Sequence, residues 1–264
     1  MDQGDERRPF RRRVTDEPPA LIRQSGSGSQ EAPGIPVKVC RGPFFMTACP
    51  AAISHAKAMT MTQHSYSNRQ RIIAGLIAAT AFAALAVQPT LGEYSYLENL
   101  AGVLRFFTIW GNVAASGTMA AIAFGFRVSP KVLASLATML TVIGLVYWGL
   151  RAGDHDPVGI DRITNQSHHT VIPAAFVVWW ALCTPPSING MQAVPAIMVP
   201  PLSYGAFAVI LGQLTGFYAY FFVDLPSLGW WQFIINNVVL AVFFALLGAG
   251  LVSLKNRFGP DLKG

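Results

Sequence analysis

The chain has 264 residues, of which 52% are hydrophobic and only 12% charged, and its mean hydropathy is +0.42. Soluble domains carry about 25% charged residues, so this composition excludes an ordinary soluble globular domain. The formal net charge of +6 comes from basic residues in the N-terminal segment and at the ends of apolar stretches. Basic residues at such places set membrane orientation, so the charge does not indicate a nucleic-acid partner.

The first 67 residues are predicted to be a disordered basic and polar tail. Arginines alternate with acidic residues at its start, and prolines and a Ser-Gly run at 25–29 follow. Such a segment cannot bury a core. No apolar region follows the Arg12-Arg13 pair, which excludes a twin-arginine signal. Met59 and Met61 stand just before the first apolar stretch, so we hypothesise that the natural protein starts there.

Six apolar stretches follow the tail. Most approach the ~20 residues with which a helix crosses a ~30 Å hydrocarbon core. The fourth is short unless its helix begins near Asn165, which would bring His168 and His169 into it. We therefore predict an all-α fold, with a six-transmembrane-helix bundle over 68–258 and a short C-terminal tail over 259–264. The stretches are 72–91, 102–126, 132–150, 170–183, 202–223 and 231–254.

The loops between the stretches differ in charge. Lys and Arg precede the first stretch, separate the second from the third and follow the sixth, whereas acidic residues prevail in the other loops. This asymmetry predicts cytoplasmic N- and C-termini in a cell (inner or plasma) membrane. Aromatic residues near the ends of the predicted spans indicate an interfacial belt: Tyr147, Trp148, Trp179, Trp180, Trp230 and Trp231.

Three polar residues recur at helical spacing in the second stretch. Arg105, Thr108 and Asn112 share one face of a continuous helix. A polar stripe in a lipid-spanning helix points into the bundle or into a wet cavity. Two plainer interpretations stay open: Thr108 bonds the carbonyl four residues before it, and Asn112 holds two helices together.

The fourth stretch begins with two adjacent histidines. His168 and His169 point about 100° apart on a helix, so only one faces the interior. Pro173 has no N–H for the carbonyl of His169, so we expect a free acceptor at the residue that carries an imidazole. Thr108 and His169 fall at overlapping depths in the outer half of the membrane, where they are predicted to meet. The alternative is an interfacial histidine beside a packing kink.

Other motifs supply little chemistry. Tyr220 and Asp224 lie toward the outer end of the fifth stretch, and Asp224 is either a loop residue or a partner of Arg105 or His169. The loop at 154–156 lacks the ligands of a calcium or zinc site, and three cysteines without paired spacing form no zinc signature. No nucleotide-binding glycine motif is present. We expect no cofactor and no metal.

Three segments together resemble a known family. They are 105–112 (RFFTIWGN), the His169-to-Pro173 motif and 212–224 (GQLTGFYAYFFVD). Their order is similar to that of the six-helix androgen-induced-protein superfamily, in particular its bacterial Pr6Pr branch. The third segment departs from the family pattern at three positions: Phe217, Ala219 and Phe221.

The resemblance covers about residues 69–257. It implies a multipass hydrolase of fatty acid esters of hydroxy fatty acids, with an intramembrane threonine nucleophile and a histidine that map to Thr108 and His169. We expect a membrane lipid or acyl-chain substrate. Arg105 or Asn112 would bind the oxyanion, and the remaining candidates to support or orient the pair are Asp161, Tyr220 and Asp224.

Two other functions compete with the hydrolase. A small transporter would use the same polar stripe as a path, but the sequence displays no inverted repeat or broken helix, which transporters usually have. A structural or assembly protein would use the polar residues only to hold its helices together.

Overall fold

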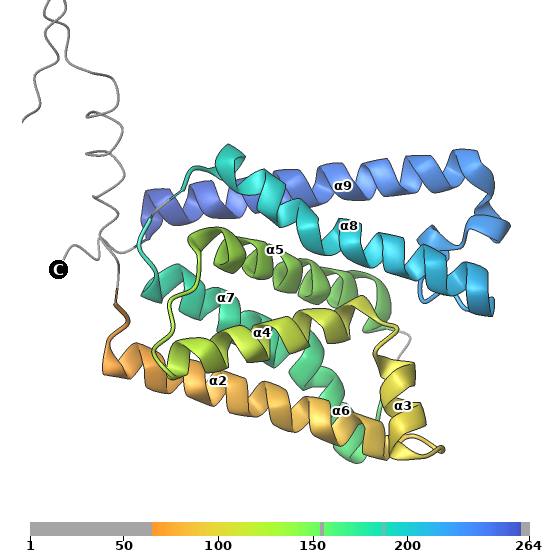
Figure 1. Cartoon of the computed structure of the whole chain (residues 1–264), viewed down its shortest axis with the longest axis horizontal. Helices are drawn as coiled ribbons and strands as arrows, with labels where there is room; N and C mark the ends of the chain where they lie inside the picture. The colour runs from red at the N-terminus through yellow and green to blue at the C-terminus, as the bar shows by residue number, and fades with distance from the viewer. Residues whose placement is uncertain (1–64, 154–155, 187, 260–264) are drawn as a thin grey trace, which may run out of the picture. The chain divides into compact units, whose positions relative to one another are not determined.

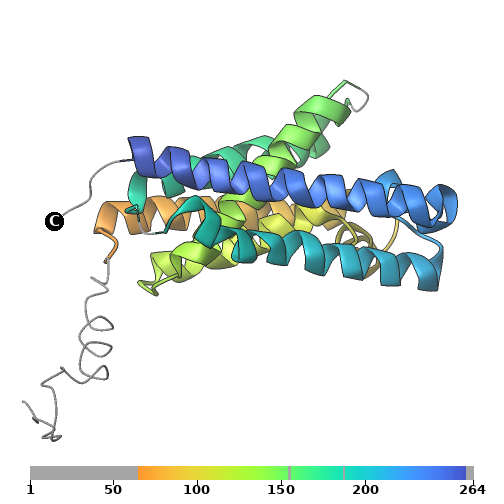
Figure 2. The ribbon, with the colours of Figure 1, turned by 90° about the horizontal axis from the view of Figure 1, so that it is seen from above.

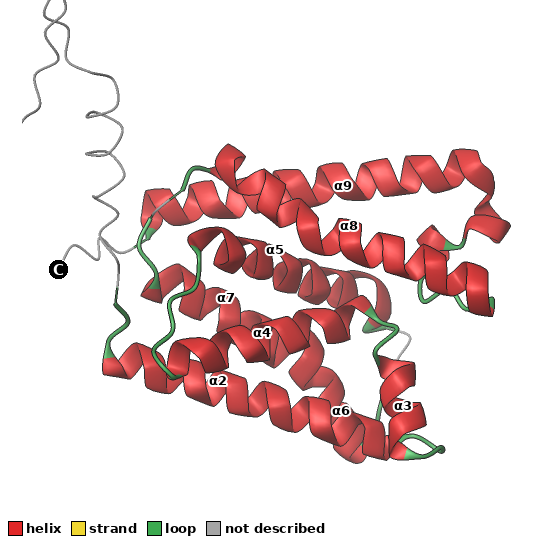
Figure 3. Cartoon of the chain, in the orientation of Figure 1, coloured by secondary structure: helices red, strands yellow, loops and turns green. Residues whose placement is uncertain are grey.

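The computed structural model describes residues 65–153, 156–186 and 188–259 (Figure 1). Most of these residues are helical, and no strand occurs among them (Figure 3). The all-α prediction is confirmed for this part of the chain. The predicted tail lies outside the described residues up to residue 64, as do residues 260–264. The elements are α2 (Asn68–Val87), η1 (Gln88–Leu91), α3 (Tyr96–Val103), α4 (Phe107–Ala123), α5 (Pro130–Val146), η2 (Tyr147–Arg151), α6 (Gly159–Gln166), η3 (Ser167–Val171), α7 (Ile172–Cys183), α8 (Gly190–Thr215), η4 (Phe221–Val223) and α9 (Leu225–Phe258).

Several of these helices suit a membrane. Four are long and apolar enough to cross one, and the bent pair of α3 and α4 is a fifth if it forms one span. Large apolar side chains on their outer faces are exposed, such as Leu246 at 69% and Leu214 at 80%. This pattern indicates a membrane protein, because lipid accepts apolar side chains that water does not. The four single helices run Asn68–Leu91, Pro130–Leu150, Gly190–Thr215 and Leu225–Phe258.

The helices pack as a bundle around α5. Its residues from Leu133 to Leu140 are all buried, between α7 and α4 on one side and α8 and α9 on the other. α2 packs along α4, and α8 along α9. Figures 1 and 2 both show the start of α2 and the end of α9 at the same end of this bundle.

Hydrogen bonds join the helix ends there. Trp179 Nε1 of α7 donates to the Gln70 carbonyl of α2 at 3.0 Å, and Gln70 Nε2 donates to the Cys183 carbonyl at 3.2 Å. Lys255 Nζ near the end of α9 donates to the Pro185 carbonyl at 2.9 Å. These bonds fix the ends of α2, α7 and α9 against one another.

The second predicted stretch is not one helix. α3 and α4 meet at 99° across residues 104–106, so the prediction of a continuous helix over 102–126 is wrong. Irregular backbone at membrane depth persists only where other groups satisfy its polar atoms. Three aromatic side chains do so here: Trp110 Nε1 donates to the Leu104 carbonyl at 2.9 Å, Tyr204 Oη donates to the Arg105 carbonyl at 2.7 Å, and Tyr220 Oη accepts from the Phe107 N–H at 3.2 Å.

The fifth helix begins and ends earlier than predicted. α8 starts at Gly190 and continues through three internal prolines. Pro200 has no N–H for the Ala196 carbonyl, and Ser135 Oγ of α5 donates to that carbonyl instead, at 2.8 Å. α8 ends before Gly216, whose φ of 74° is left-handed. The predicted stretch of 202–223 is therefore wrong at both bounds.

Two π-helical turns lie at the ends of α5 and α6. α5 passes into the π-turn η2, and α6 passes through the π-turn η3 into α7. The fourth helical segment thus begins at Gly159, which carries His168 and His169 into the bundle. Single π-turns inside helices are often found at functional sites.

The expected aromatic belt is only partly present. Trp148, Trp230 and Trp231 are exposed, but Trp179 and Trp180 are buried in the main hydrophobic core of the bundle. Tyr147 was assigned to the belt too, and it is 97% buried. Its place is in the candidate site.

Candidate functional site

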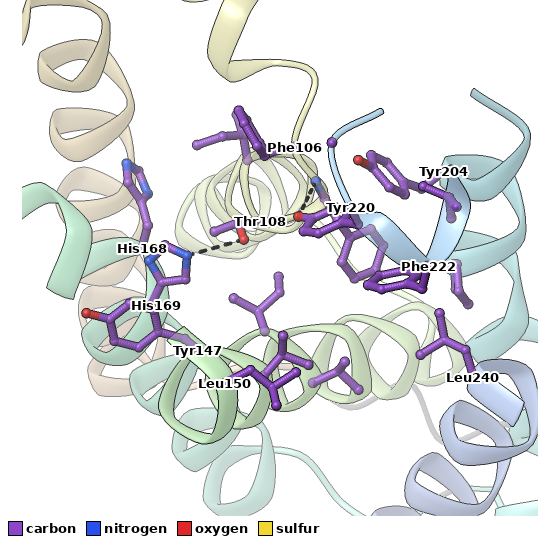
Figure 4. Close-up of a pocket in the computed structure, with 18 of the residues that line it drawn as sticks. Phe106, Thr108, Tyr147, Leu150, His168, His169, Tyr204, Tyr220, Phe222 and Leu240 are labelled. Carbon is purple, nitrogen blue, oxygen red and sulfur yellow. Dashed lines mark hydrogen bonds between the residues drawn. The ribbon is translucent and has the colours of Figure 1, made fainter. Parts of the chain in front are cut away.

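A cavity of about 590 Å³ opens between α4, α5, the α6–α7 segment, α8 and α9. Its volume is in the usual range for small-molecule sites. The walls are mainly aliphatic and aromatic. Figure 4 shows His169 on one side of the cavity and Phe222 on the other, with Thr108 between His169 and Tyr220.

Thr108 and His169 meet at this wall. Thr108 Oγ1 lies 3.4 Å from His169 Nε2, although the residues are 61 apart in the chain (Figure 4). The predicted juxtaposition is present. His168 points away from Thr108 toward α2, and its ring lies near the Ala84 backbone.

The other ring nitrogen of His169 fixes the tautomer. Nδ1 lies 3.0 Å from the Asn165 carbonyl oxygen, which only accepts hydrogen bonds. Nδ1 therefore carries the proton, and Nε2 presents its lone pair to the Thr108 hydroxyl. A histidine held in this way is arranged to take a proton from the threonine.

Tyr147 holds the imidazole from the side. Its ring stacks on that of His169, with centroids 4.4 Å apart and planes 23° apart. Tyr147 Oη accepts from Asn165 Nδ2 at 2.7 Å and from Gln166 Nε2 at 3.2 Å. Sequence reasoning missed this role because Tyr147 stands beside Trp148 at a span end. The polar pair Asn165-Gln166 before the histidines was the available signal.

The helix break places Thr108 at the start of α4. Thr108 is the second residue of that helix, and the N–H groups of a first turn have no partner inside the helix. The positive end of the α4 dipole also lies here. The Thr108 N–H is thus suited to a developing negative charge beside its own side chain.

Arg105 does not share a face with Thr108. It lies in the break between α3 and α4, and its guanidinium carbon lies 5.0 Å from the centre of the Phe217 ring. Arg105 lines a second cavity, of about 580 Å³, rather than the one with Thr108. The prediction of one polar stripe is wrong because the chain bends between these two residues.

Asn112 is buried and points toward the helix backbones. Its Nδ2 group donates to the Thr108 carbonyl at 2.8 Å and to the His168 carbonyl at 3.0 Å. Both donors are engaged, so Asn112 is not arranged to bind an oxyanion. The carbonyl that Asn112 contacts is that of His168, one residue before the carbonyl that is predicted to be free.

Each acidic candidate has a partner of its own. Asp224 caps α9 through hydrogen bonds from the N–H and the hydroxyl of Ser227. Asp161 lines both cavities and accepts from Gln88 Nε2 at 3.5 Å. The atom that orients the imidazole is the Asn165 carbonyl, which residue type alone does not reveal. Tyr220 lines the cavity and holds the start of α4.

No cluster of three metal-ligating side chains occurs in the part of the chain that the structure describes. Two residues of the loop at 154–156 lie outside that part.

No family model, curated protein or solved structure matches this chain. The described residues define a class: an all-helical protein of membrane type, with a threonine–histidine pair at an apolar cavity.

Proposed function

We propose that this protein is an intramembrane hydrolase of fatty acid esters, with Thr108 as the nucleophile and His169 as the general base. One observation carries the proposal. Thr108 Oγ1 lies 3.4 Å from an imidazole nitrogen whose tautomer is fixed by the Asn165 carbonyl, at the wall of an apolar cavity. A separation of this size in an unliganded site tightens when substrate binds.

The chemistry follows from this arrangement. Thr108 Oγ attacks the ester carbonyl carbon while His169 Nε2 takes the hydroxyl proton. The Thr108 N–H at the positive end of α4 stabilises the oxyanion. The intermediate collapses, and the alcohol leaves with the proton from Nε2. Water, activated by the same nitrogen, then hydrolyses the acyl–threonine ester and releases the fatty acid.

The cavity sets the size of the substrate. At the ~30 Å³ that a small group occupies in a liquid, about 590 Å³ holds roughly twenty non-hydrogen atoms, which is one long acyl chain. The second cavity adjoins the first at Gln88, Val103 and Asp161 and is lined by charged residues. We assign it to the entry of water and the exit of the polar product.

The membrane topology belongs to the same proposal. α6, η3 and α7 follow one another directly with eight, five and twelve residues, which is about 37 Å at 1.5 Å per residue. Counted with the four long helices and the bent pair, they give six spans. The start of α2 and the end of α9 lie at one end of the bundle, which supports N- and C-termini on the same side of the membrane. The Lys and Arg residues of the loops assign that side to the cytoplasm. We propose membership of the Pr6Pr branch on the sequence motifs alone.

A second candidate function is transport. The break between α3 and α4 leaves the N-terminus of α4 beside the cavity, and discontinuous helices of this kind form the binding sites of transporters. The expectation that no helix is broken was wrong, so this argument against a transporter no longer holds. A transporter does not need a covalent intermediate, and the two functions are separated by testing for one.

The test is covalent labelling with a long-chain fluorophosphonate in native membranes. We expect the label on the peptide that contains Thr108, lost in Thr108→Ala and strongly reduced in His169→Ala. The matched control is Thr118→Ala, on the same helix but outside the cavity. Retention of the label in Thr108→Ala would exclude the nucleophile that we assign.

A further inference from the structure

One buried amide connects the two helices that carry the reacting pair. Asn112 Nδ2 donates one N–H to the carbonyl of Thr108 and the other to the carbonyl of His168, the residue before His169. Asn112 is fully buried, and its Oδ1 has no hydrogen-bond partner among the described residues. An unsatisfied buried oxygen is unfavourable, so two helices could be held together at lower cost by apolar packing.

The His168 carbonyl is free because of the π-turn and the proline together. In η3 the N–H of Ile172 donates to the Ser167 carbonyl, five residues back. In the same register the next donor would be residue 173, bonding to His168. Residue 173 is proline and has no N–H. Asn112 supplies the donor that the backbone lacks.

The geometry points to Asn112 as the positioning residue of the reaction, which sets the distance between Thr108 Oγ1 and His169 Nε2 through these two carbonyls. The importance of Asn112 to catalysis rests on the proposed function. Its effect on the placement of the two side chains exists whether or not the protein turns over a substrate. Each of the two hydrogen bonds holds a peptide group directly at or next to a reacting residue. Removal of the amide donors releases η3 from α4, and the imidazole is then no longer held beside the hydroxyl.

The test replaces the hydroxyl by a thiol, so that it needs no substrate. The parent protein carries Thr108→Cys, with the three native cysteines at 40, 49 and 183 changed to serine. His169 Nε2 takes the thiol proton, and the thiolate is the form that reacts with an alkylating agent. We measure the rate of alkylation by N-ethylmaleimide on the full chain in detergent. His169→Ala should slow it by at least about tenfold.

Asn112→Leu should slow alkylation by about the same factor as His169→Ala. The matched control is Asn236→Leu, which removes only a contact with Gln232 on α9 and should leave the rate unchanged. Equal rates for the parent and Asn112→Leu would overturn the inference. So would equal rates for the parent and His169→Ala, because no pair would then exist to be positioned.

Pro173→Ala provides the second variant and guards against loss of folding. It restores a backbone N–H for the His168 carbonyl. In this background, the factor by which Asn112→Leu slows alkylation should therefore be at least about threefold smaller. Such coupling is expected of residues that share one partner. If Asn112→Leu slows alkylation by the same factor with proline and with alanine at position 173, the two residues do not act on the same carbonyl, and the inference is contradicted.

Esterase assays on the same variants, made with Thr108 intact, separate the two proposals. If the protein has no esterase activity and Asn112→Leu still slows alkylation, the hydrolase fails and the positioning role stands. If the protein hydrolyses esters and Asn112→Leu changes neither kcat nor KM, the positioning role fails and the hydrolase stands.

Discussion

Replacing Tyr147 tests how much the orientation of His169 contributes to turnover. The tyrosine ring stacks on the imidazole at 4.4 Å, and its hydroxyl accepts two amide hydrogen bonds. A stacked pair contributes about 0.5–1.5 kcal/mol beyond area burial, and each membrane hydrogen bond averages about 0.6 kcal/mol. Tyr147→Leu removes both, roughly 1.7–2.7 kcal/mol, and Tyr147→Phe removes only the hydrogen bonds, about 1.2 kcal/mol.

These energies set upper bounds on the rate losses. At 1.36 kcal/mol per factor of ten, kcat should fall by up to about 20- to 100-fold in Tyr147→Leu and by less than about tenfold in Tyr147→Phe. The assay is release of fatty acid from a single-chain ester by purified protein, with thermal stability measured in parallel. Tyr218→Phe is the matched control, because that hydroxyl contacts Gln213 outside the cavity. Equal kcat values for Tyr147→Leu and Tyr147→Phe would refute the role of the stack.

Two further predictions concern the fold and are measured by thermal unfolding in detergent. Ser135→Ala leaves the Ala196 carbonyl without its donor and should lower the free energy of unfolding by about 1 kcal/mol; adding Pro200→Ala should restore most of it, and no recovery would contradict the pairing. A Cβ on Gly190 would lie 2.5 Å from the Ala249 carbonyl oxygen, so Gly190→Ala should destabilise the α8–α9 contact by about 1–3 kcal/mol. Gly205→Ala meets open space and should have no such effect; similar losses in both would contradict the packing.

The sequence predicted the helical class and the contact between Thr108 and His169 for partly different reasons. Composition and the length of the apolar stretches were sufficient to predict helices such as α2. In lipid, few backbone structures other than a helix satisfy their own polar groups. The meeting of Thr108 and His169 followed from depth and from the choice of one histidine. It did not depend on the stripe with Arg105, which the structure does not contain.

The break before Thr108 was not predictable from local residues. The segment Leu104-Arg105-Phe106 contains no glycine or proline, and its turn is held by Tyr204, 99 residues further along the chain, and by Tyr220. A contact of that separation leaves no periodic signal. In α8 the helix continues through three prolines, and Ser135 on another helix satisfies a carbonyl that one of them frees.

The support of His169 was hidden for a similar reason. Its orienting atom is a backbone carbonyl, which every residue has, whereas residue type points to the carboxylates of Asp161 and Asp224. π-turns change the helical register by one residue and leave hydrophobic periodicity almost unaltered. The α-helical register predicts a free carbonyl at His169, and the π register of η3 leaves the His168 carbonyl without a backbone donor as well, so that Asn112 bonds to it.

The most direct test of the central claim is hydrolysis of a long-chain fatty acid ester by purified protein, compared among the wild type, Thr108→Ala, Thr108→Ser and Thr118→Ala. We expect Thr108→Ala to lose at least about 10³-fold in kcat with unchanged thermal stability, because a single membrane hydrogen bond contributes only about 0.6 kcal/mol. Thr108→Ser should keep partial activity, and Thr118→Ala should match the wild type. Hydrolysis by Thr108→Ala at the wild-type rate would contradict the assignment of Thr108 as the nucleophile.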